Sequence, residues 1–139
     1  VLDLQPGEAV LEYGGGSGYG AALMAQMGAV ATLWETDAAA LDLAKAAVAA
    51  AGLSVSATSD RPGDDRFDAV LVAGACEVPP EELFPLLRDG GRLIVVEGLG
   101  RAARVKLYQK TSGGVSGRPV FDAAAPALAE FRKKPAFVF

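Results

Sequence analysis

Residues 10–20 read Val-Leu-Glu-Tyr-Gly-Gly-Gly-Ser-Gly-Tyr-Gly, a short apolar run that leads directly into a glycine-rich loop. Ala9–Tyr13 is typical of a buried strand, and residues 19–27 predict a helix that Gly28 ends in a left-handed cap. Glycines between the two permit positive φ angles and let a ligand approach the backbone closely. Because a helix start adds free N–H groups and partial positive charge, this stretch predicts a ligand site.

The same alternation of strand and helix continues after this loop. Residues 30–34 predict a second strand, either Thr36 or Asp37 then caps a helix, and Gly52 closes that helix. Residues 53–57 predict a third strand. The apolar face of the helix repeats at helical spacing and consists of Leu41, Ala44, Val48 and Ala51.

Residues 67–73 form an apolar run that predicts a central strand. Pro79 and Pro80 then open a short helix, whose expected inner face consists of Leu83, Leu86 and Leu87. A turn at Gly90 and Gly91 precedes a fifth strand over residues 92–97, and residues 105–110 and 116–121 predict a hairpin. Residues 137–139 are a candidate last strand.

This order of elements predicts one domain, residues 1–139, of the α/β class. Repeated β-α-β units favour a Rossmann-like, doubly wound, mostly parallel sheet, here closed by an antiparallel C-terminal hairpin. Ligands of such sheets bind at the carboxyl ends of the strands, where the strand order reverses. The glycine loop is expected at that place.

The glycine spacing of the loop fits two kinds of cofactor site. Gly14, Gly16 and Gly18 fit the pattern E-x-G-x-G-x-G, in which Glu12 is the acidic residue. The dinucleotide pattern G-x-G-x-x-G fails from Gly14, but its weaker form ending in alanine fits from Gly16. A carboxylate can hold the ammonium group of a methionine moiety but would sit badly beside a pyrophosphate. Glu12 therefore favours S-adenosylmethionine and leaves a nicotinamide cofactor as the less favoured alternative.

Two further acidic residues follow the second and third predicted strands. Glu35 can accept both ribose hydroxyls, and together with the glycine loop it is a cofactor contact rather than a solvated strand end. Asp60 could contact the adenine amino group. It is equally compatible with a polar loop, because three other charged residues crowd the same stretch.

The amino-acid composition argues against several classes of function. The net charge of −4 disfavours nucleic acid as a partner, and the absence of histidine removes histidine catalysis and histidine-ligated metal sites. The single cysteine, Cys76, excludes an internal disulfide and is expected to be a small buried hydrophobe rather than a nucleophile. No apolar run reaches the roughly 20 residues that span a bilayer, and no signal-like segment precedes the first strand. These features favour a cytoplasmic protein.

Segments 10–23, 31–37, 67–83 and 86–98, together with the ending 120–139, resemble the protein-L-isoaspartate O-methyltransferase family. The resemblance implies a class I methyltransferase fold, S-adenosylmethionine as cofactor, and O-methylation of L-isoaspartyl residues in damaged proteins. It implies no catalytic side chain, since methyl transfer from a sulfonium depends mainly on positioning and desolvation. The cofactor contacts that we expect are Glu12, Gly14, Gly15, Gly16, Ser17, Gly18, Tyr19, Glu35, Asp60, Ala73 and Gly74.

The chain departs from the family pattern in two places. Gly15 stands where members usually carry Thr, which is a mild change. Members also carry a long segment before the glycine strand that shapes the isoaspartyl pocket, and this sequence begins shortly before that strand. Two interpretations follow. The chain is a carboxyl methyltransferase or its cofactor domain, or it is a non-catalytic accessory subunit whose uncovered sheet face binds a protein partner.

Overall fold

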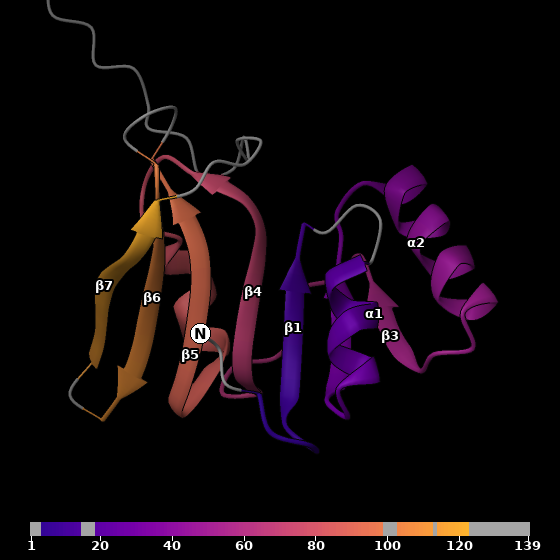
Figure 1. Cartoon of the computed structure of the whole chain (residues 1–139), viewed down its shortest axis with the longest axis horizontal. Helices are drawn as coiled ribbons and strands as arrows, with labels where there is room; N and C mark the ends of the chain where they lie inside the picture. Colours follow the sequence, from indigo (N-terminus) through magenta and orange to yellow (C-terminus); the bar gives the residue numbers. More distant parts are fainter. Residues whose placement is uncertain (1–3, 15–18, 99–102, 113, 123–139) are drawn as a thin grey trace, which may run out of the picture.

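The computed structural model describes residues 4–14, 19–98, 103–112 and 114–122. These residues form a 7-stranded sheet in the order β3-β2-β1-β4-β5-β6-β7, with β1 to β5 parallel and β6 and β7 antiparallel (Figure 1). The predicted doubly wound sheet with an antiparallel C-terminal hairpin is therefore confirmed. Its strands are β1 (Ala9–Tyr13), β2 (Val30–Trp34), β3 (Val55–Thr58), β4 (Phe67–Cys76), β5 (Leu87–Glu97), β6 (Arg104–Thr111) and β7 (Gly114–Asp122), and its helices are α1 (Tyr19–Gln26), α2 (Ala38–Ala50) and the 3₁₀ helix η1 (Glu81–Leu86).

Two apolar clusters lie on opposite faces of the sheet. Side chains of α1 and α2 pack with Val10, Leu33 and Ala69 on one face. On the other face η1 packs with Leu11 and Val70, which are the next residues along the same strands. This alternation is the period of two that a strand dictates. It places Glu12, which follows Leu11, on the face that carries α1.

The helices of the first half begin and end as the sequence indicates. Asp37, not Thr36, is the N-cap of α2, and its carboxylate accepts from the backbone N–H of Ala39 at 3.0 Å. Gly28 and Gly52 adopt the positive φ angles expected after each helix. Helix α1 ends at Gln26, one residue before the predicted end.

One predicted core position of α2 is wrong. Leu41, Ala44 and Val48 are buried, but Ala51 is the exposed C-cap, because the helix ends at Ala50 and Gly52 with its φ of +69 follows. The third strand also begins later than predicted. The N–H of Leu53 is still bonded to the carbonyl of Val48, so the first strand residue is Val55.

The region between β4 and β5 differs most from the prediction. Pro85 cannot donate a backbone hydrogen bond, and the expected helix is a short 3₁₀ helix that ends at Leu86. Leu87 therefore starts β5 instead of completing a helix face. Gly90, with φ +80, lies within β5, where the register with β4 shifts. The predicted turn is thus a bulge inside one longer strand.

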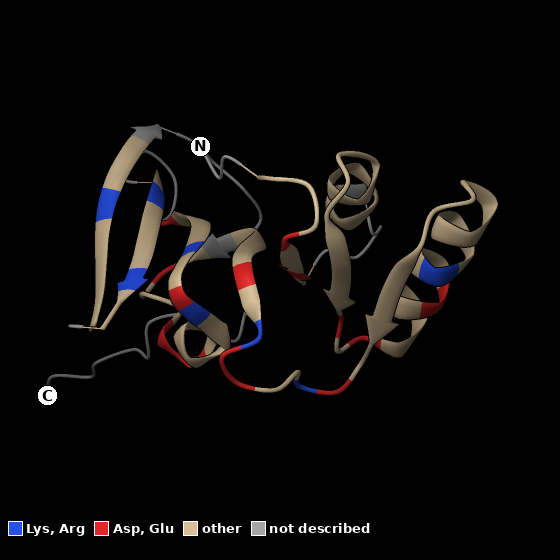
Figure 2. Ribbon diagram, turned by 90° about the horizontal axis from the view of Figure 1, so that it is seen from below, with Lys and Arg blue, Asp and Glu red and all other residues tan. Residues whose placement is uncertain are grey.

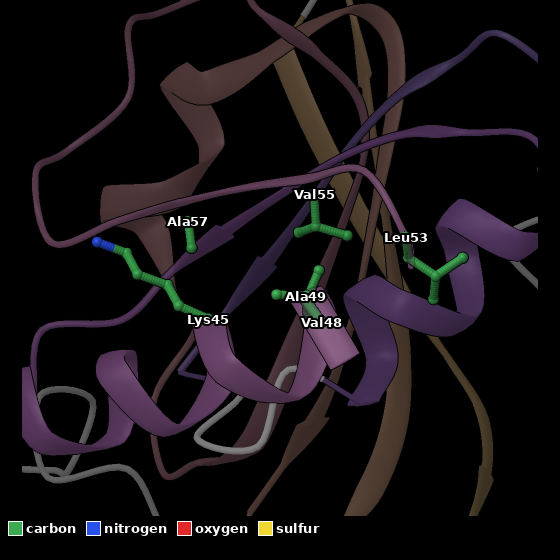
Figure 3. A pocket seen from close by; sticks show the side chains of 6 residues that line it. All are labelled: Lys45, Val48, Ala49, Leu53, Val55 and Ala57. Atoms are coloured by element: carbon green, nitrogen blue, oxygen red, sulfur yellow. The ribbon is translucent and has the colours of Figure 1, made fainter. Parts of the chain in front are cut away.

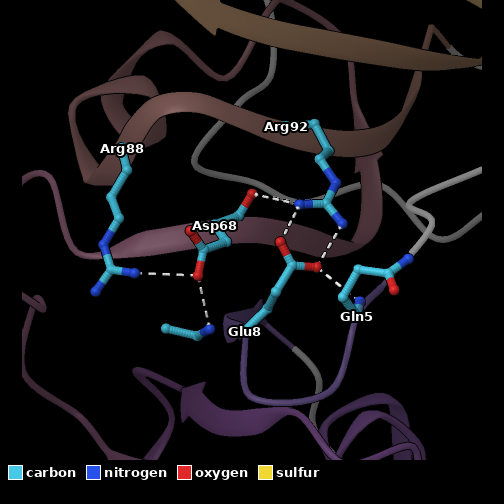
Figure 4. Close-up of polar contacts among 6 residues, drawn as sticks. Gln5, Glu8, Asp68, Arg88 and Arg92 are labelled. Atoms are coloured by element: carbon cyan, nitrogen blue, oxygen red, sulfur yellow. Dashed lines mark hydrogen bonds and ion pairs between the residues drawn. The ribbon is translucent and has the colours of Figure 1, made fainter.

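An ion-pair cluster joins three strands at the amino end of the sheet (Figure 4). The Arg92 guanidinium donates to both carboxylate oxygens of Glu8 at 2.8 Å, and also to the backbone carbonyl of Asp68. The Asp68 carboxylate accepts from Arg88 and from the N–H of Ala9. We call these four charged residues the Glu8–Arg92 cluster. It fixes the starts of β1, β4 and β5 relative to one another.

The two helices that cover one face of the sheet carry little charge. Helix α1 contains no charged residue, and α2 contains only Asp42 and Lys45. Figure 2 marks the charged residues of the described chain by colour. On the same face, half-buried Leu71 and Ile94 pair in register and line an apolar groove of about 180 Å³. A protein partner on this face stays a prediction. Within the described residues, no helix is long and apolar enough to cross a membrane.

Candidate functional site

The register of the sheet brings the predicted site residues to one edge. Tyr13, Trp34, Thr58 and Val72 lie side by side across β1, β2, β3 and β4. The residues that come next along each strand therefore share the carboxyl edge of the sheet. They include Gly14, Glu35 and Ala73, with Asp60 two positions beyond Thr58. The chain runs outward from β1 through β2 to β3, and then outward in the other direction from β4 to β7. The strand order therefore reverses between β1 and β4, which is where ligands of such sheets bind.

Glu12 is the buried acid of this edge, with only 3% of its surface exposed. Its carboxylate accepts a hydrogen bond at 3.0 Å from the backbone N–H of Ala21, in the first turn of α1. Burial raises the pKa of the Glu12 carboxyl, hydrogen bonds from Ala21 and Gly20 oppose that rise, and the negative charge of Glu35 adds to it. No cation of the described part of the chain is among these causes. The site can therefore accommodate a positively charged ligand group.

Gly20 is required by the closeness of Glu12 to the helix. A Cβ at position 20 would lie 2.4 Å from Oε2 of Glu12 and 3.0 Å from a methyl carbon of Leu71. Gly14 is required for a different reason, because its φ is +72 and its N–H donates to the carbonyl of Trp34 at 3.0 Å. This bond ties the residue that follows β1 to the last residue of β2.

Glu35 lies at the end of β2 and is partly exposed. Its backbone N–H donates to the carbonyl of Thr58 at 3.0 Å, and its carboxylate accepts from the N–H of Thr36 at 3.1 Å. Asp60 is exposed, and its N–H donates to the hydroxyl of Thr58 at 3.0 Å. The two acids thus lie beyond neighbouring strands, where the sequence places them.

The remaining predicted contacts divide into two groups. Ala73 and Gly74 lie within β4, the first exposed and the second buried. Tyr19 begins α1, but its side chain lies outside the described residues, as do Gly15, Gly16, Ser17 and Gly18. The assignment of all these residues to a cofactor site stays a prediction.

Aromatic and sulfur side chains near this edge have structural contacts. Trp34 packs edge-to-face on Tyr13, with ring centroids 4.8 Å apart, and its Nε1 donates to the carbonyl of Ser59 at 3.2 Å. Cys76 is fully buried in the apolar cluster on the η1 face. Its predicted role as a small buried hydrophobe is confirmed.

The sequence analysis missed a polar pocket farther along the same edge. A hollow of about 350 Å³ is lined by Glu77, Glu97, Gly98, Arg104, Lys106 and Pro119. Glu97 accepts from Nζ of Lys106 at 3.2 Å and from the hydroxyl of Tyr108. The sequence does contain a signal for this pocket, because Glu97 follows the apolar run of β5 in the same way that Glu35 follows the apolar run of β2.

A third hollow, of about 300 Å³, lies between α2 and β3 (Figure 3). Val48, Ala49, Leu53 and Val55 line it, and Lys45 supplies a cation at its rim. Carboxylates are missing from its described lining, so it lacks the acceptors that a ribose or an ammonium group requires. In the part of the chain that the structure describes, no group of His, Cys, Asp or Glu could hold a metal ion.

The family model of protein-L-isoaspartate(D-aspartate) O-methyltransferase matches residues 1–124. The chain belongs to this family. A protein-L-isoaspartate O-methyltransferase of Methylorubrum populi is 44% identical over 106 residues, which are 70% of this chain and 49% of that protein. The chain thus spans about half the length of this relative.

Solved structures agree with the family. A protein-L-isoaspartate O-methyltransferase superposes with a TM-score of 0.78 at 25% identity, covering 92% of this chain and 44% of that one. A Plasmodium falciparum structure, described as a putative protein-L-isoaspartate O-methyltransferase in complex with S-adenosyl-L-homocysteine, has a TM-score of 0.76 at 19% identity. It covers 91% of this chain and 67% of that one, and at this identity it supports the fold alone. The predicted family and fold class are confirmed.

Proposed function

We propose that this chain binds S-adenosylmethionine at the carboxyl edge of β1 and β2 and serves the O-methylation of L-isoaspartyl residues in proteins. The observation that carries the proposal is the buried Glu12 carboxylate, placed against the first turn of α1 and near Glu35. The negative charge of Glu35 adds to the rise of the Glu12 pKa, and two nearby carboxylates favour a ligand that carries positive charge. The cofactor offers an ammonium group and a sulfonium.

The residues present fit such a ligand. Glu12 can hold the ammonium group, directly or through water, while Glu35 can accept the two ribose hydroxyls. Asp60 would contact the adenine amino group, and Ala73 and Gly74 would line the opposite side. Gly15, Gly16, Ser17, Gly18 and Tyr19 complete the proposed set. The glycine loop would supply backbone N–H groups to the cofactor carboxylate.

Bound S-adenosylmethionine would supply the methyl group, which would pass from its sulfonium sulfur to a carboxylate oxygen of the acceptor and give a thioether and a methyl ester. The acceptor carboxylate is already deprotonated at neutral pH, so this step needs no general base. The chain then contributes position and desolvation. Glu12 anchors one end of the cofactor at the start of α1, and the end of β4 excludes water beside it.

Isoaspartyl protein as the acceptor is supported by family membership and by the relatives, which are protein-L-isoaspartate O-methyltransferases. A solved structure of the same fold was described with S-adenosyl-L-homocysteine, the product of methyl transfer. We also propose a cytoplasmic location, which the single, buried Cys76 supports. An acidic net charge of −4 supports a protein rather than a nucleic-acid partner.

The cofactor site is tested by thermal unfolding with S-adenosylhomocysteine. At about 100 times its dissociation constant, this ligand should stabilise the wild-type chain by roughly 2.7 kcal/mol. Glu35→Ala should remove much of that gain, whereas Asp42→Ala, which removes an exposed acid of α2, should keep it. A folded wild-type chain whose melting temperature does not respond to the ligand would reject the proposed site.

A further inference from the structure

The polar pocket beyond β5 has no role in the cofactor site but shares its edge. Glu97 ends β5, and Arg104 pairs with it at the start of β6, so the pocket lies at the carboxyl edge of the sheet. In the strand order, β4 lies between β1 and β5. A molecule held there would be beside the proposed cofactor, not in its place.

Lys106 is held in this pocket by two neighbours. Its Nζ donates to Glu97 and lies 5.3 Å from the ring centroid of Tyr108. The Tyr108 hydroxyl donates to the other oxygen of the same carboxylate. Because an ammonium group has three donors, the bond to Glu97 leaves Lys106 able to donate to a ligand.

The pocket carries charges of both signs. Arg104 and Lys106 are two residues apart on β6 and therefore project from the same face of the strand. Glu77 and Glu97 belong to the same lining. A phosphate group has no N–H groups to donate to the two carboxylates. A peptide segment fits this lining better, because its carbonyl and carboxylate oxygens accept hydrogen bonds while its amide N–H groups donate them.

We propose that this pocket binds the peptide that carries the methyl acceptor. Lys106 and Arg104 donate to its carboxylate or carbonyl oxygens, and Glu77 and Glu97 accept from its amide groups. Tyr108 is a positioning residue that acts through Glu97. Burial, followed by the hydrogen bond to Glu97, raises the pKa of the Tyr108 hydroxyl, so it stays a donor at neutral pH. The inference rests on the function proposed above and names the substrate side of that site.

The test measures the affinity of the whole chain for a fluorescent isoaspartyl peptide by anisotropy, with saturating S-adenosylhomocysteine present. Lys106→Gln should weaken peptide binding about tenfold, because it removes a charge-assisted hydrogen bond. Lys106→Arg keeps the charge and should stay within about threefold of wild type. Lys45→Gln, which removes a lysine from α2, should leave the affinity unchanged. Arg104→Gln is a second variant at an exposed position and should also weaken binding.

The affinity for S-adenosylhomocysteine, measured on the same samples, separates the possible failures. If wild type binds the peptide and Lys106→Gln and Arg104→Gln bind it equally well, the pocket is not the peptide site, and the proposed function stands. If wild type binds S-adenosylhomocysteine but no isoaspartyl peptide, the proposed acceptor is wrong and this inference falls with it. If both variants lose affinity for the peptide and keep the wild-type affinity for S-adenosylhomocysteine, the pocket is supported as the peptide site.

Discussion

At the scale of single residues, the contact between Gly20 and Glu12 decides the geometry of the proposed site. Glu12 is only 3% exposed, and its carboxylate occupies the space that the Cβ of any other residue at position 20 would need. Glycine is costly inside a helix, by about 1 kcal/mol relative to alanine. Its presence in the first turn of α1 indicates that the position of Glu12 outweighs this cost.

Gly20→Ala should therefore destabilise the chain, although alanine is the better helix former. The new Cβ would be 2.4 Å from Oε2 of Glu12, and overpacking of this kind costs roughly 1–3 kcal/mol. We expect a lower midpoint in urea unfolding and weaker binding of S-adenosylhomocysteine. Gly63→Ala is the matched control, since no atom lies within 4 Å of its Cβ. Unchanged stability and ligand affinity in Gly20→Ala would contradict the described contact.

Single-residue chemistry was partly predictable from the sequence. Glu12 and Glu35 stand out because each ends an apolar run beside a loop, and the strand register then brings them to one edge. Glu97 has the same local pattern but was missed, since its partners Lys106 and Tyr108 come from another strand. Pairing between strands is a tertiary property that no local pattern contains.

At the scale of elements, the N-cap of α2 is a direct local effect. The carboxylate of Asp37 satisfies backbone N–H groups that have no partner inside the helix. Sequence alone left Thr36 and Asp37 as alternatives, because both residue types cap helices and they are adjacent. The structure decides between them, since the Asp37 carboxylate accepts from the N–H groups of Ala39 and Ala40 in the first turn of the helix.

Asp37→Ala should lower the free energy of unfolding by about 1 kcal/mol, which is the usual loss at an N-cap. Thr36→Ala, one residue earlier and exposed, should change it by less than about 0.5 kcal/mol. Urea unfolding followed by circular dichroism measures both values. If the two variants lost the same free energy of unfolding, Asp37 would not be the specific N-cap.

Element boundaries were less predictable where proline and glycine interrupt the pattern. Gly90 and Gly91 indicated a turn, but β5 pairs with β4 on both sides of them with a shifted register, so the glycines form a bulge inside β5. Local sequence identifies a place where the backbone bends. Whether a strand resumes in the same direction depends on the neighbouring strand.

At the scale of the whole molecule, the Glu8–Arg92 cluster connects distant parts of the chain at the amino end of the sheet. The hydrogen bond from Arg92, opposed by burial, lowers the pKa of the Glu8 carboxyl from 4.5 to about 2. A carboxyl whose folded pKa is lowered stabilises the fold above its unfolded pKa. That contribution is lost as the pH falls from about 4.5 to about 2.

Glu8→Gln should therefore be less stable than wild type at pH 7, and the difference should shrink below pH 4.5 and vanish near pH 2. Unfolding by urea at several pH values measures this convergence. Asp64→Asn is the control, because its ion pair with Arg61 is exposed on both sides and contributes little at any pH. A stability difference that does not change with pH would show that the charge of Glu8 is not the cause.

The order of strands has one more consequence. In the described residues, only the β1–β4 pair joins β1, β2 and β3 to the consecutive strands β4, β5, β6 and β7. The loop between these two halves, residues 59–66, is largely exposed. If the backbone were cut there, each fragment would keep its own neighbouring strands and present one complementary free edge, reinforced by the contacts of Glu8 and Ala9. The protein is thus suited to reconstitution from two separately made fragments, in which recovered ligand binding would report their association.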